Sequence, residues 1–355
     1  MKFNQIYWNV FFLLSASLAA EGLKIGFFVN HMSVGGVEVS TYDYADFNET
    51  ILGNTSYILN YTVYANRPGN YLNPDHSRTT NEKFIKRFGN RFYDCNSMQE
   101  VDAIIKRENI EIFYVQKAGP VDDKISHVCK NAVHAVFTEL QPHGNVYAGI
   151  SKWLSSLYKG AKLPHVPYMV RVADTDQTLR AELGIPKDAV VFGRHGSSGT
   201  FDISFAQEAV REMAALHPNW YFVFLNTNKF CNVPNVIFLP SNADMVYKTK
   251  FINTCDAMIH ARHRGETFGL ACAEFSIKNK PVITWFGSDE RNHIEVLGKT
   301  GLYYNSKPEL KKLMEEIGEN ITEVRSGNWD AYSKDFNPEA VMKKFEEVFI
   351  KPCLK

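Results

Sequence analysis

Short apolar runs alternate with polar, amphipathic stretches along almost the whole chain, and this alternation limits the fold more than any other feature. The short runs have the length and composition of buried β-strands, and the stretches between them carry apolar residues at helical spacing. Strands separated by helices indicate parallel sheets, because parallel neighbours need crossover connections. The sequence therefore predicts an α/β protein.

The strand-like runs fall into two series of similar length, and 355 residues allow two domains of ordinary size. A Pro-containing stretch without strong periodicity, residues 164–186, separates the series and is the expected interdomain connection. We predict domains at 23–163 and 187–334 and a final helix at 335–350, capped by Asn337. The expected strands are 23–29, 57–59, 112–115, 135–137, 189–192, 221–225, 236–239, 257–259 and 281–284.

Composition excludes several classes of protein. Lys plus Arg is 39 and Asp plus Glu is 39, so the chain has no basic surplus for general nucleic-acid binding. Six Cys are too dilute for a disulfide scaffold, and none stands in a cluster of zinc spacing, so we expect no structural metal site. Cys255 and Cys272 lie in apolar runs, where buried thiols are expected.

Residues 1–20 combine a positive start, a short apolar middle and small residues at the end, which is typical of a secretory signal peptide. The apolar run is shorter than the roughly 20 residues that a spanning helix needs, so we expect no permanent transmembrane segment. A signal peptide predicts the lumen of the secretory pathway (endoplasmic reticulum or Golgi) or secretion. The alternative is an apolar extension of a cytoplasmic protein.

Residues 256–284 form the most informative segment, with the pattern strand, loop, helix, turn, strand. A helix is expected to begin near Gly269, and its N-terminal N–H groups and dipole suit a diphosphate. Gly269 would let the backbone approach that ligand closely. Glu274, one to two turns into the helix, is placed to accept hydrogen bonds from ribose hydroxyls, and Glu266 is expected to face the group beyond the phosphates. In open α/β sheets, ligands bind outside the carboxyl ends of the strands, where this loop lies.

The run GETFGLACAE, followed by NKPVIT, resembles the E-x7-E signature of retaining, nucleotide-sugar-dependent glycosyltransferases of the GT-B fold, in glycosyl transferase group 1 (family 4-like). Thr267 stands where these enzymes usually have Gly, and Lys280 stands beside the Pro. The runs at 42–46 and 141–144 also look like those of uncharacterised viral and cyanobacterial glycosyltransferase-like sequences. The resemblance implies two Rossmann-like domains facing a cleft, with the C-terminal helix crossing back to the first domain.

The resemblance also implies roles for individual residues. Glu266 and His143 would act at the transferred sugar, and Arg194 would neutralise the diphosphate. The family normally has a Lys-Gly five or six residues after that Arg, whereas this chain has Gly199 and Thr200, so one phosphate cation is missing. Arg262 and Arg264 are candidate replacements. The residues expected to bind the donor are Arg194, Phe268, Gly269, Leu270, Glu274, Gly35 and Gly36.

The implied activity is transfer of a sugar from a nucleotide-diphosphate donor to an unknown acceptor (glycan, lipid or protein), with retention and with no metal or other cofactor. Residues 174–176 form a D-x-D, the metal motif of a different glycosyltransferase fold, but they fall in the interdomain connection and are expected to be surface acids. Two alternatives remain open. One is a secreted two-lobe solute-binding protein; the other is a degenerate glycosyltransferase-like protein that binds a sugar nucleotide without transfer.

Overall fold

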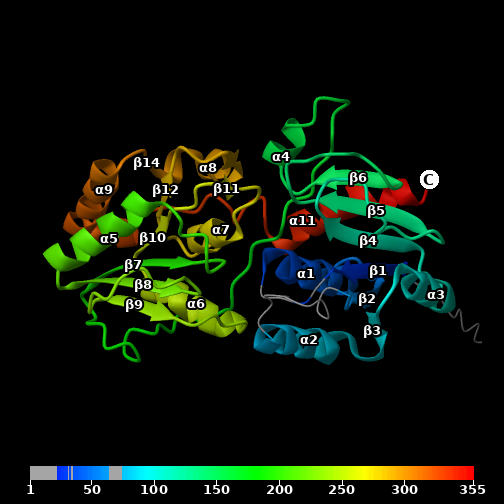
Figure 1. Ribbon diagram of the computed structural model, residues 1–355, viewed down its shortest axis with the longest axis horizontal. Coiled ribbons are helices and arrows are strands. Elements are labelled where there is room, and N and C mark those ends of the chain that lie inside the picture. The colour runs from blue at the N-terminus through cyan, green and yellow to red at the C-terminus, as the bar shows by residue number, and fades with distance from the viewer. Residues whose placement is uncertain (1–21, 31, 33–34, 64–73) are drawn as a thin grey trace, which may run out of the picture.

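The computed structural model describes residues 22–30, 32, 35–63 and 74–355, which form two α/β domains side by side (Figure 1). The expected signal peptide at residues 1–20 lies outside these ranges. Within them, no helix has the length and apolar character needed to cross a bilayer.

The first domain is built on a parallel sheet of six strands in the order β3-β2-β1-β4-β5-β6. Its central strand β4 is buried at every position, as expected for a strand covered by helices on both faces. The elements of this domain are β1 (Lys24–Val29), α1 (Gly36–Thr50), β2 (Thr55–Tyr61), α2 (Pro74–Phe88), β3 (Phe92–Cys95), α3 (Met98–Glu108), β4 (Ile112–Lys117), β5 (Lys130–Ala135), β6 (Val146–Gly149) and α4 (Lys152–Ser156).

The second domain has another six-stranded parallel sheet, in the order β14-β12-β10-β7-β8-β9, and a small two-stranded sheet of β11 and β13. Its elements are β7 (Val190–His195), α5 (Ser204–Leu216), β8 (Trp220–Leu225), β9 (Val236–Leu239), α6 (Met245–Thr254), β10 (Ala257–His260), β11 (Gly265–Glu266), α7 (Leu270–Ile277), β12 (Val282–Trp285), β13 (Glu290–Arg291), α8 (Asn292–Leu297), β14 (Leu302–Tyr304), α9 (Lys307–Glu319) and α10 (Ile321–Ser326).

Both large sheets have the strand order of a Rossmann fold, which confirms the predicted fold class. In such a sheet the strand order reverses at one point, here between β1 and β4 and between β7 and β10, and ligands bind at the carboxyl ends of the strands there. Close packing at the second of these points explains Gly193 in β7, because a Cβ at this position would lie 2.2 Å from Cys255 Sγ. A ligand site is therefore expected in the segments that follow β1 and β4 and in those that follow β7 and β10.

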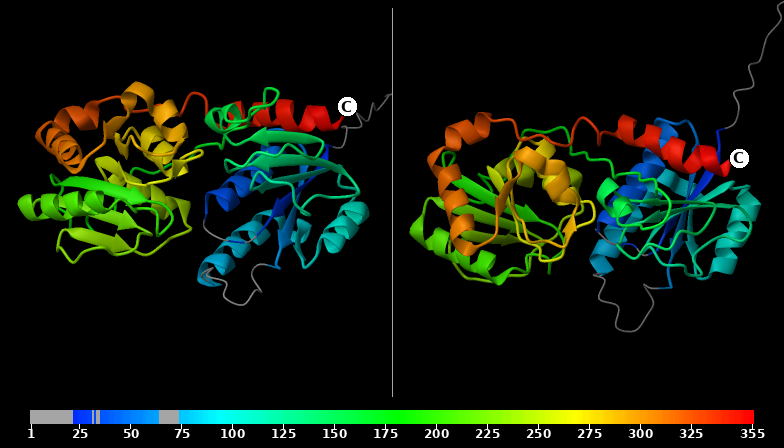
Figure 2. Two further views of the ribbon diagram at one scale, coloured as in Figure 1. Left: turned by 45° about the horizontal axis from the view of Figure 1, so that its top comes forward. Right: turned by 90° about the horizontal axis from the view of Figure 1, so that it is seen from above.

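The C-terminal segment returns to the first domain, as predicted (Figure 2). Helix α11 (Pro338–Phe345) begins at Asn337, whose side chain accepts a hydrogen bond from Ala340 N, and continues through a π-helical turn (Glu346–Ile350) and α12 (Lys351–Cys353). The Phe345 ring packs 5.1 Å from the rings of Tyr44 and Tyr114 in the first domain. The crossing helix therefore shares the core of the domain on which it lies.

Four strands of the two large sheets differ from the prediction. Three of them, β3, β6 and β14, have no counterpart among the expected strands. For the fourth, the sequence predicts a strand at 135–137, whereas β5 spans Lys130–Ala135 and ends just before Val136.

Polar residues explain why β5 was misplaced. The Asn131 amide donates to Ser126 O, and His134 is hydrogen-bonded to Tyr114 Oη and Val166 O. Because these side chains have buried partners, a strand that reads as polar can lie inside the sheet, between β4 and β6.

Candidate active site

A cleft of about 670 Å³ lies between the two domains, beside the carboxyl ends of the central strands of the second sheet. Its lining includes Gly35 and Gly36 at the start of α1, and Arg194 and His195 at the end of β7. It also includes residues 266–271, which contain the mouth of α7. The structure therefore gathers most of the predicted donor-binding residues around one cavity: Gly35, Gly36, Arg194, Glu266, Phe268, Gly269, Leu270 and Glu274.

Glu274 is the more deeply buried of the two predicted acids, with 2% of its surface exposed. Lys248 Nζ, on α6, donates a hydrogen bond to Glu274 Oε1, and His195 Nε2 lies 3.0 Å from Oε2. Burial alone would raise the pKa of Glu274, but Lys248 and His195 outweigh burial and lower it, so this carboxylate is ionised. The contact with His195 Nε2 does not have hydrogen-bond geometry, so Oε2 accepts no hydrogen bond from the described residues and can still accept one.

Glu266 lies at the end of the small strand β11 and is held from two sides. Arg262 donates to Oε2 at 2.8 Å, and His260 Nε2 lies 3.3 Å from Oε1. Burial raises the pKa of Glu266, but the His260 hydrogen bond and the Arg262 charge lower it to about 2. Glu266 is therefore a carboxylate at every working pH, suited to stabilising positive charge and unable to serve as a proton donor.

A hydrogen-bonded chain that includes two histidines lies behind Glu266. Thr284 Oγ1 lies 2.8 Å from His260 Nδ1 and 3.1 Å from His293 Nε2. Burial lowers the pKa of His293 well below its usual range, so its ring is neutral. At the other end of the chain, His260 donates from Nε2 to the Glu266 carboxylate.

The low pKa of Glu266 predicts a pH dependence of stability. Its folded pKa of about 2 is lower than the roughly 4.3 of an unfolded Glu, so its stabilising contribution is complete above the unfolded value and is lost as the pH falls toward 2. The free energy of unfolding of wild type should exceed that of Glu266→Gln most at neutral pH, and the gap should close between pH 4 and 2. Denaturant titrations at several pH values measure this difference in the free energy of unfolding. A difference that does not change with pH would contradict the low pKa of Glu266.

The mouth of α7 has the backbone geometry that the sequence predicts. Gly269 is the N-cap residue, with φ of +91°, a conformation that L side chains rarely adopt. A Cβ at this position would also lie 2.9 Å from His293 Cβ and 3.3 Å from Glu266 Cβ. A glycine is therefore needed both for the backbone turn and for the approach of Glu266 and His293, and the helix start that it exposes faces the cleft.

Arg194 lines the cleft but is buried, with 3% of its surface exposed. Its terminal nitrogens donate to Thr227 Oγ1 at 2.6 Å, to Asn226 O at 3.3 Å, to Ser197 O at 2.9 Å and to Thr200 Oγ1. Burial lowers its pKa to about 10, which leaves the guanidinium charged at neutral pH. Thr200, which stands near the place of the family's Lys, accepts a hydrogen bond from Arg194 and does not supply a second cation.

The two candidate replacement cations are in different places. Arg262 lines the cleft, where it pairs with Glu266. Arg264 is not among the lining residues: its Nε donates to Glu290 at 2.8 Å, and its guanidinium lies 5.2 Å from the centre of the Phe137 ring in the other domain. The geometry supports Arg262 and does not support Arg264 as a phosphate cation.

His143 also has a place other than the expected one. It is not among the residues that line the cleft. Its Nδ1 lies 2.7 Å from Gln141 O, Lys117 Nζ lies 3.0 Å from Nε2, and the ring packs against Tyr147. Because both ring nitrogens are engaged by their own loop and by β4, the structure does not support the expected contact between His143 and a sugar.

The lining residues that the sequence did not predict include one lysine and two histidines: Lys248, His195 and His260. Lys248 supplies a cation of the cleft from α6, a helix that carries no recognised motif. Tertiary contacts alone place it beside Glu274, 26 positions along the chain. His195 directly follows Arg194 at the end of β7, and that position was the available signal for it.

No family model matches the sequence, and no curated protein matches it either. Solved structures do match over nearly the whole chain. A glycosyltransferase from Rickettsia africae has 15% identity and a TM-score of 0.63 and covers 94% of this chain and 99% of its own. Anabaena HepE, in complex with UDP and glucose, has 14% identity and a TM-score of 0.66 and covers 92% and 98%. The chain has the GT-B fold.

The GT-B fold is shared by proteins of more than one activity. A putative UDP-N-acetylglucosamine 2-epimerase from Listeria monocytogenes matches at 12% identity with a TM-score of 0.58, covering 92% of this chain and 96% of its own. Similarity at this level of identity concerns the fold, so function has to be argued from the side chains of the cleft.

Proposed function

We propose that the chain is a glycosyltransferase that moves a sugar from a nucleoside-diphosphate donor to an acceptor hydroxyl, with retention at the anomeric carbon. The observation that carries this proposal is the pair of ionised carboxylates, Glu266 and Glu274, on either side of a helix mouth that opens into an interdomain cleft. Retention is implied by the resemblance of the E-x7-E segment. The solved structures with the same fold, one of them containing UDP and glucose, support the donor class.

The proposed donor lies mainly on the second domain. Its diphosphate takes hydrogen bonds from the backbone N–H groups at the mouth of α7, and the buried charge of Arg194 stabilises it in the low-dielectric interior. Glu274 Oε2, the buried acceptor without a hydrogen bond among the described residues, receives a ribose hydroxyl. Arg262 and the start of α1 at Gly35 and Gly36 close the phosphate end of the cleft.

In the proposed reaction, the bond between the anomeric carbon and the phosphate oxygen breaks, and a bond from the acceptor oxygen to the same carbon forms. The acceptor proton passes to the leaving diphosphate, which departs with the electron pair of the broken bond. Positive charge builds up on the sugar and negative charge on the leaving group. Glu266 stabilises the first and Arg194 with the α7 mouth stabilises the second, without rearranging when the charges develop.

The test is a panel of UDP- and GDP-sugars scored for release of free nucleoside diphosphate and for a new glycoside. We expect turnover of at least one donor, and a fall of about 10²-fold in Glu266→Gln, since a stabilising charge in a closed site contributes on this order. Glu295→Gln, which changes an exposed glutamate on α8, is the matched control and should keep wild-type turnover.

The same panel of UDP- and GDP-sugars distinguishes the proposed transferase from the alternative functions. Free-sugar binding with no turnover would identify a two-lobe solute-binding protein, and sugar-nucleotide binding with no turnover would identify a degenerate transferase. An altered donor sugar without release of diphosphate would identify an epimerase. Any of these results, or full turnover by Glu266→Gln, would contradict the proposed transfer.

A further inference from the structure

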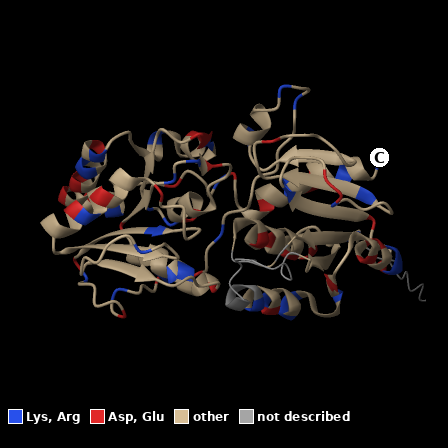
Figure 3. Ribbon diagram, viewed as in Figure 1, with Lys and Arg blue, Asp and Glu red and all other residues tan. Residues whose placement is uncertain are grey.

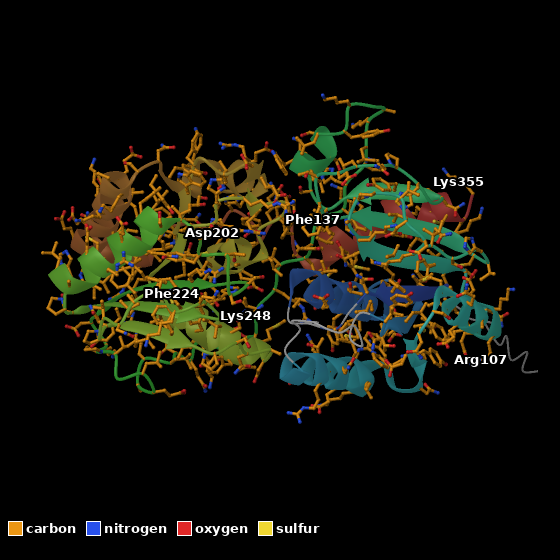
Figure 4. The ribbon with its side chains drawn as sticks, in the orientation of Figure 1. Arg107, Phe137, Asp202, Phe224, Lys248 and Lys355 are labelled. Atoms are coloured by element: carbon orange, nitrogen blue, oxygen red, sulfur yellow. The ribbon has the colours of Figure 1, made fainter. Side chains whose placement is uncertain are left out.

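A second, small cavity of about 80 Å³ lies next to the cleft, at the junction of α1, α2 and α6. Val39, Asn242 and Lys248 line both cavities, so the two are adjacent. The first domain supplies most of the wall of the small cavity, with Tyr42, Thr80, Lys83 and Phe84 among its residues. Figure 4 labels Lys248 at this junction, beside the first domain.

Lys83 is a cation in the wall of this cavity to which the described residues give no hydrogen-bond or ion-pair partner. Its ammonium lies 3.8 Å from the centre of the Tyr42 ring, and it makes no hydrogen bond or ion pair with any residue in the described part of the chain. Burial lowers its pKa. Lys83 is partly buried, and Asp43 and Asp46 act on its charge only at longer range, so among the described residues its closest polar contact is the face of an aromatic ring.

The neighbouring charges are already paired. Arg171 donates to Asp43 at 2.9 Å, Arg87 donates to Asp46 at 2.6 Å, and Lys248 donates to Glu274. Glu38, the acid in the wall of the cavity, is buried and has an interaction partner of its own. None of these ion pairs includes Lys83, whose attraction to Asp43 and Asp46 acts at longer range. Figure 3 shows Lys and Arg on both α2 and α6.

The size of the cavity limits what it can hold. One water needs about 10–15 Å³ by the same measure, so 80 Å³ is enough for a group of several heavy atoms, such as a phosphate or a carboxylate. The rest of such a ligand would have to lie in the adjoining cleft. The Thr80 hydroxyl and the Asn242 amide are further polar groups in the wall.

We propose that the cavity between α1, α2 and α6 is an anion subsite in which Lys83 binds a phosphate or carboxylate group of the acceptor. The assignment to the acceptor rests on the proposed function, in which the second domain holds the donor and leaves the first domain to the acceptor. The anion itself is assigned from the Lys83 ammonium, which has no hydrogen bond or ion pair with a described residue, from the size of the cavity and from its place beside the cleft. Lys83 is a binding residue here and takes no part in bond breaking.

The first test does not depend on any transferase activity. Inorganic phosphate and acetate are titrated calorimetrically into the protein in the presence of excess UDP, which occupies the proposed diphosphate subsite. Wild type should bind at least one of the two anions, and Lys83→Met should weaken that binding about tenfold or more, as expected for loss of a hydrogen bond to a charged group. Lys86→Met, an exposed lysine on the same helix, is the matched control and should bind as wild type does.

Lys83→Arg restores the charge and should recover much of the binding, while thermal unfolding shows that each variant is folded. Preference for phosphate over acetate, or the reverse, identifies the anion class. Equal affinity in wild type and Lys83→Met, or no binding of either anion by folded wild type, would overturn the subsite.

The second test concerns the acceptor. With a donor that the protein turns over, glucose, glucose 6-phosphate and glucuronate are compared as acceptors. We expect an anionic acceptor to have a KM at least tenfold lower than that of glucose. Lys83→Met should remove this difference, whereas the control Lys86→Met should keep both the difference and the hydrolysis of the donor in water. An equal or better KM for glucose, or an anionic preference that survives in Lys83→Met, would contradict the assignment to the acceptor. Failure of every donor would contradict the proposed function, and the anion titration would still decide the subsite.

Discussion

Replacing Arg194 with Met should lower the turnover number for the donor by a factor of about 10² to 10³, the range found when one preorganised stabiliser of developing charge is removed. Arg194 is the buried cation beside the proposed leaving group, and its pKa of about 10 keeps it charged at neutral pH. The measurement is the steady-state rate of nucleoside-diphosphate release at saturating donor.

Controls separate the charge of Arg194 from its hydrogen bonds to the following loop. Arg194→Lys retains the charge but cannot reproduce the planar fork that reaches Thr200 and Thr227, so it should recover only part of the rate. Arg107→Met removes an exposed arginine at the far end of the first domain and should leave the rate unchanged (Figure 4). Wild-type turnover in Arg194→Met would show that the diphosphate is stabilised elsewhere.

Replacing Glu274 with Ala should lower the free energy of unfolding of the second domain by about 3 kcal/mol, because it leaves Lys248 without its counter-charge in a buried site. Chemical denaturation followed by fluorescence measures the effect. The variant should also lose affinity for nucleoside diphosphates, since the buried acceptor Oε2 is removed with the rest of the carboxylate.

The double variant Glu274→Leu with Lys248→Met provides the control for this pair. Replacing both charges by apolar groups of similar size removes the unpaired charge, so most of the lost stability should return. Affinity for the nucleotide should stay low. A double variant as unstable as Glu274→Ala would show that the loss does not come from an unpaired Lys248.

The fold was predictable from the sequence because the central strands of both sheets are buried and apolar. The strands that were not predicted, β3, β6 and β14, have only three or four residues each. The strand that was misplaced had a different reason. β5 carries His134 and Asn131, whose polarity is satisfied by partners from other segments, so its hydropathy gave the wrong bounds. The mouth of α7 was predictable for a local reason: Gly269 has a positive φ, and both glutamates are within a few residues of it.

Pairings between distant segments were not predictable. Lys248 reaches Glu274 from a helix without a motif, and Lys83 reaches the small cavity beside the cleft from α2 in the other domain. The role expected for His143 came from a resemblance, and the role expected for Arg264 came from its place in the loop before Glu266. Local contacts to Gln141 O and to Glu290 keep both side chains out of the cleft lining. Short-range patterns identify which residues carry chemistry, and only tertiary packing decides which of them meet.

A crystal structure of the protein with bound UDP is the most direct test of where the donor binds. The account predicts the β-phosphate within hydrogen-bonding distance of the backbone N–H groups at residues 269–271, and a ribose hydroxyl on Glu274 Oε2. A nucleotide bound away from α7, or a ribose that leaves Glu274 paired only with Lys248 and His195, would contradict it.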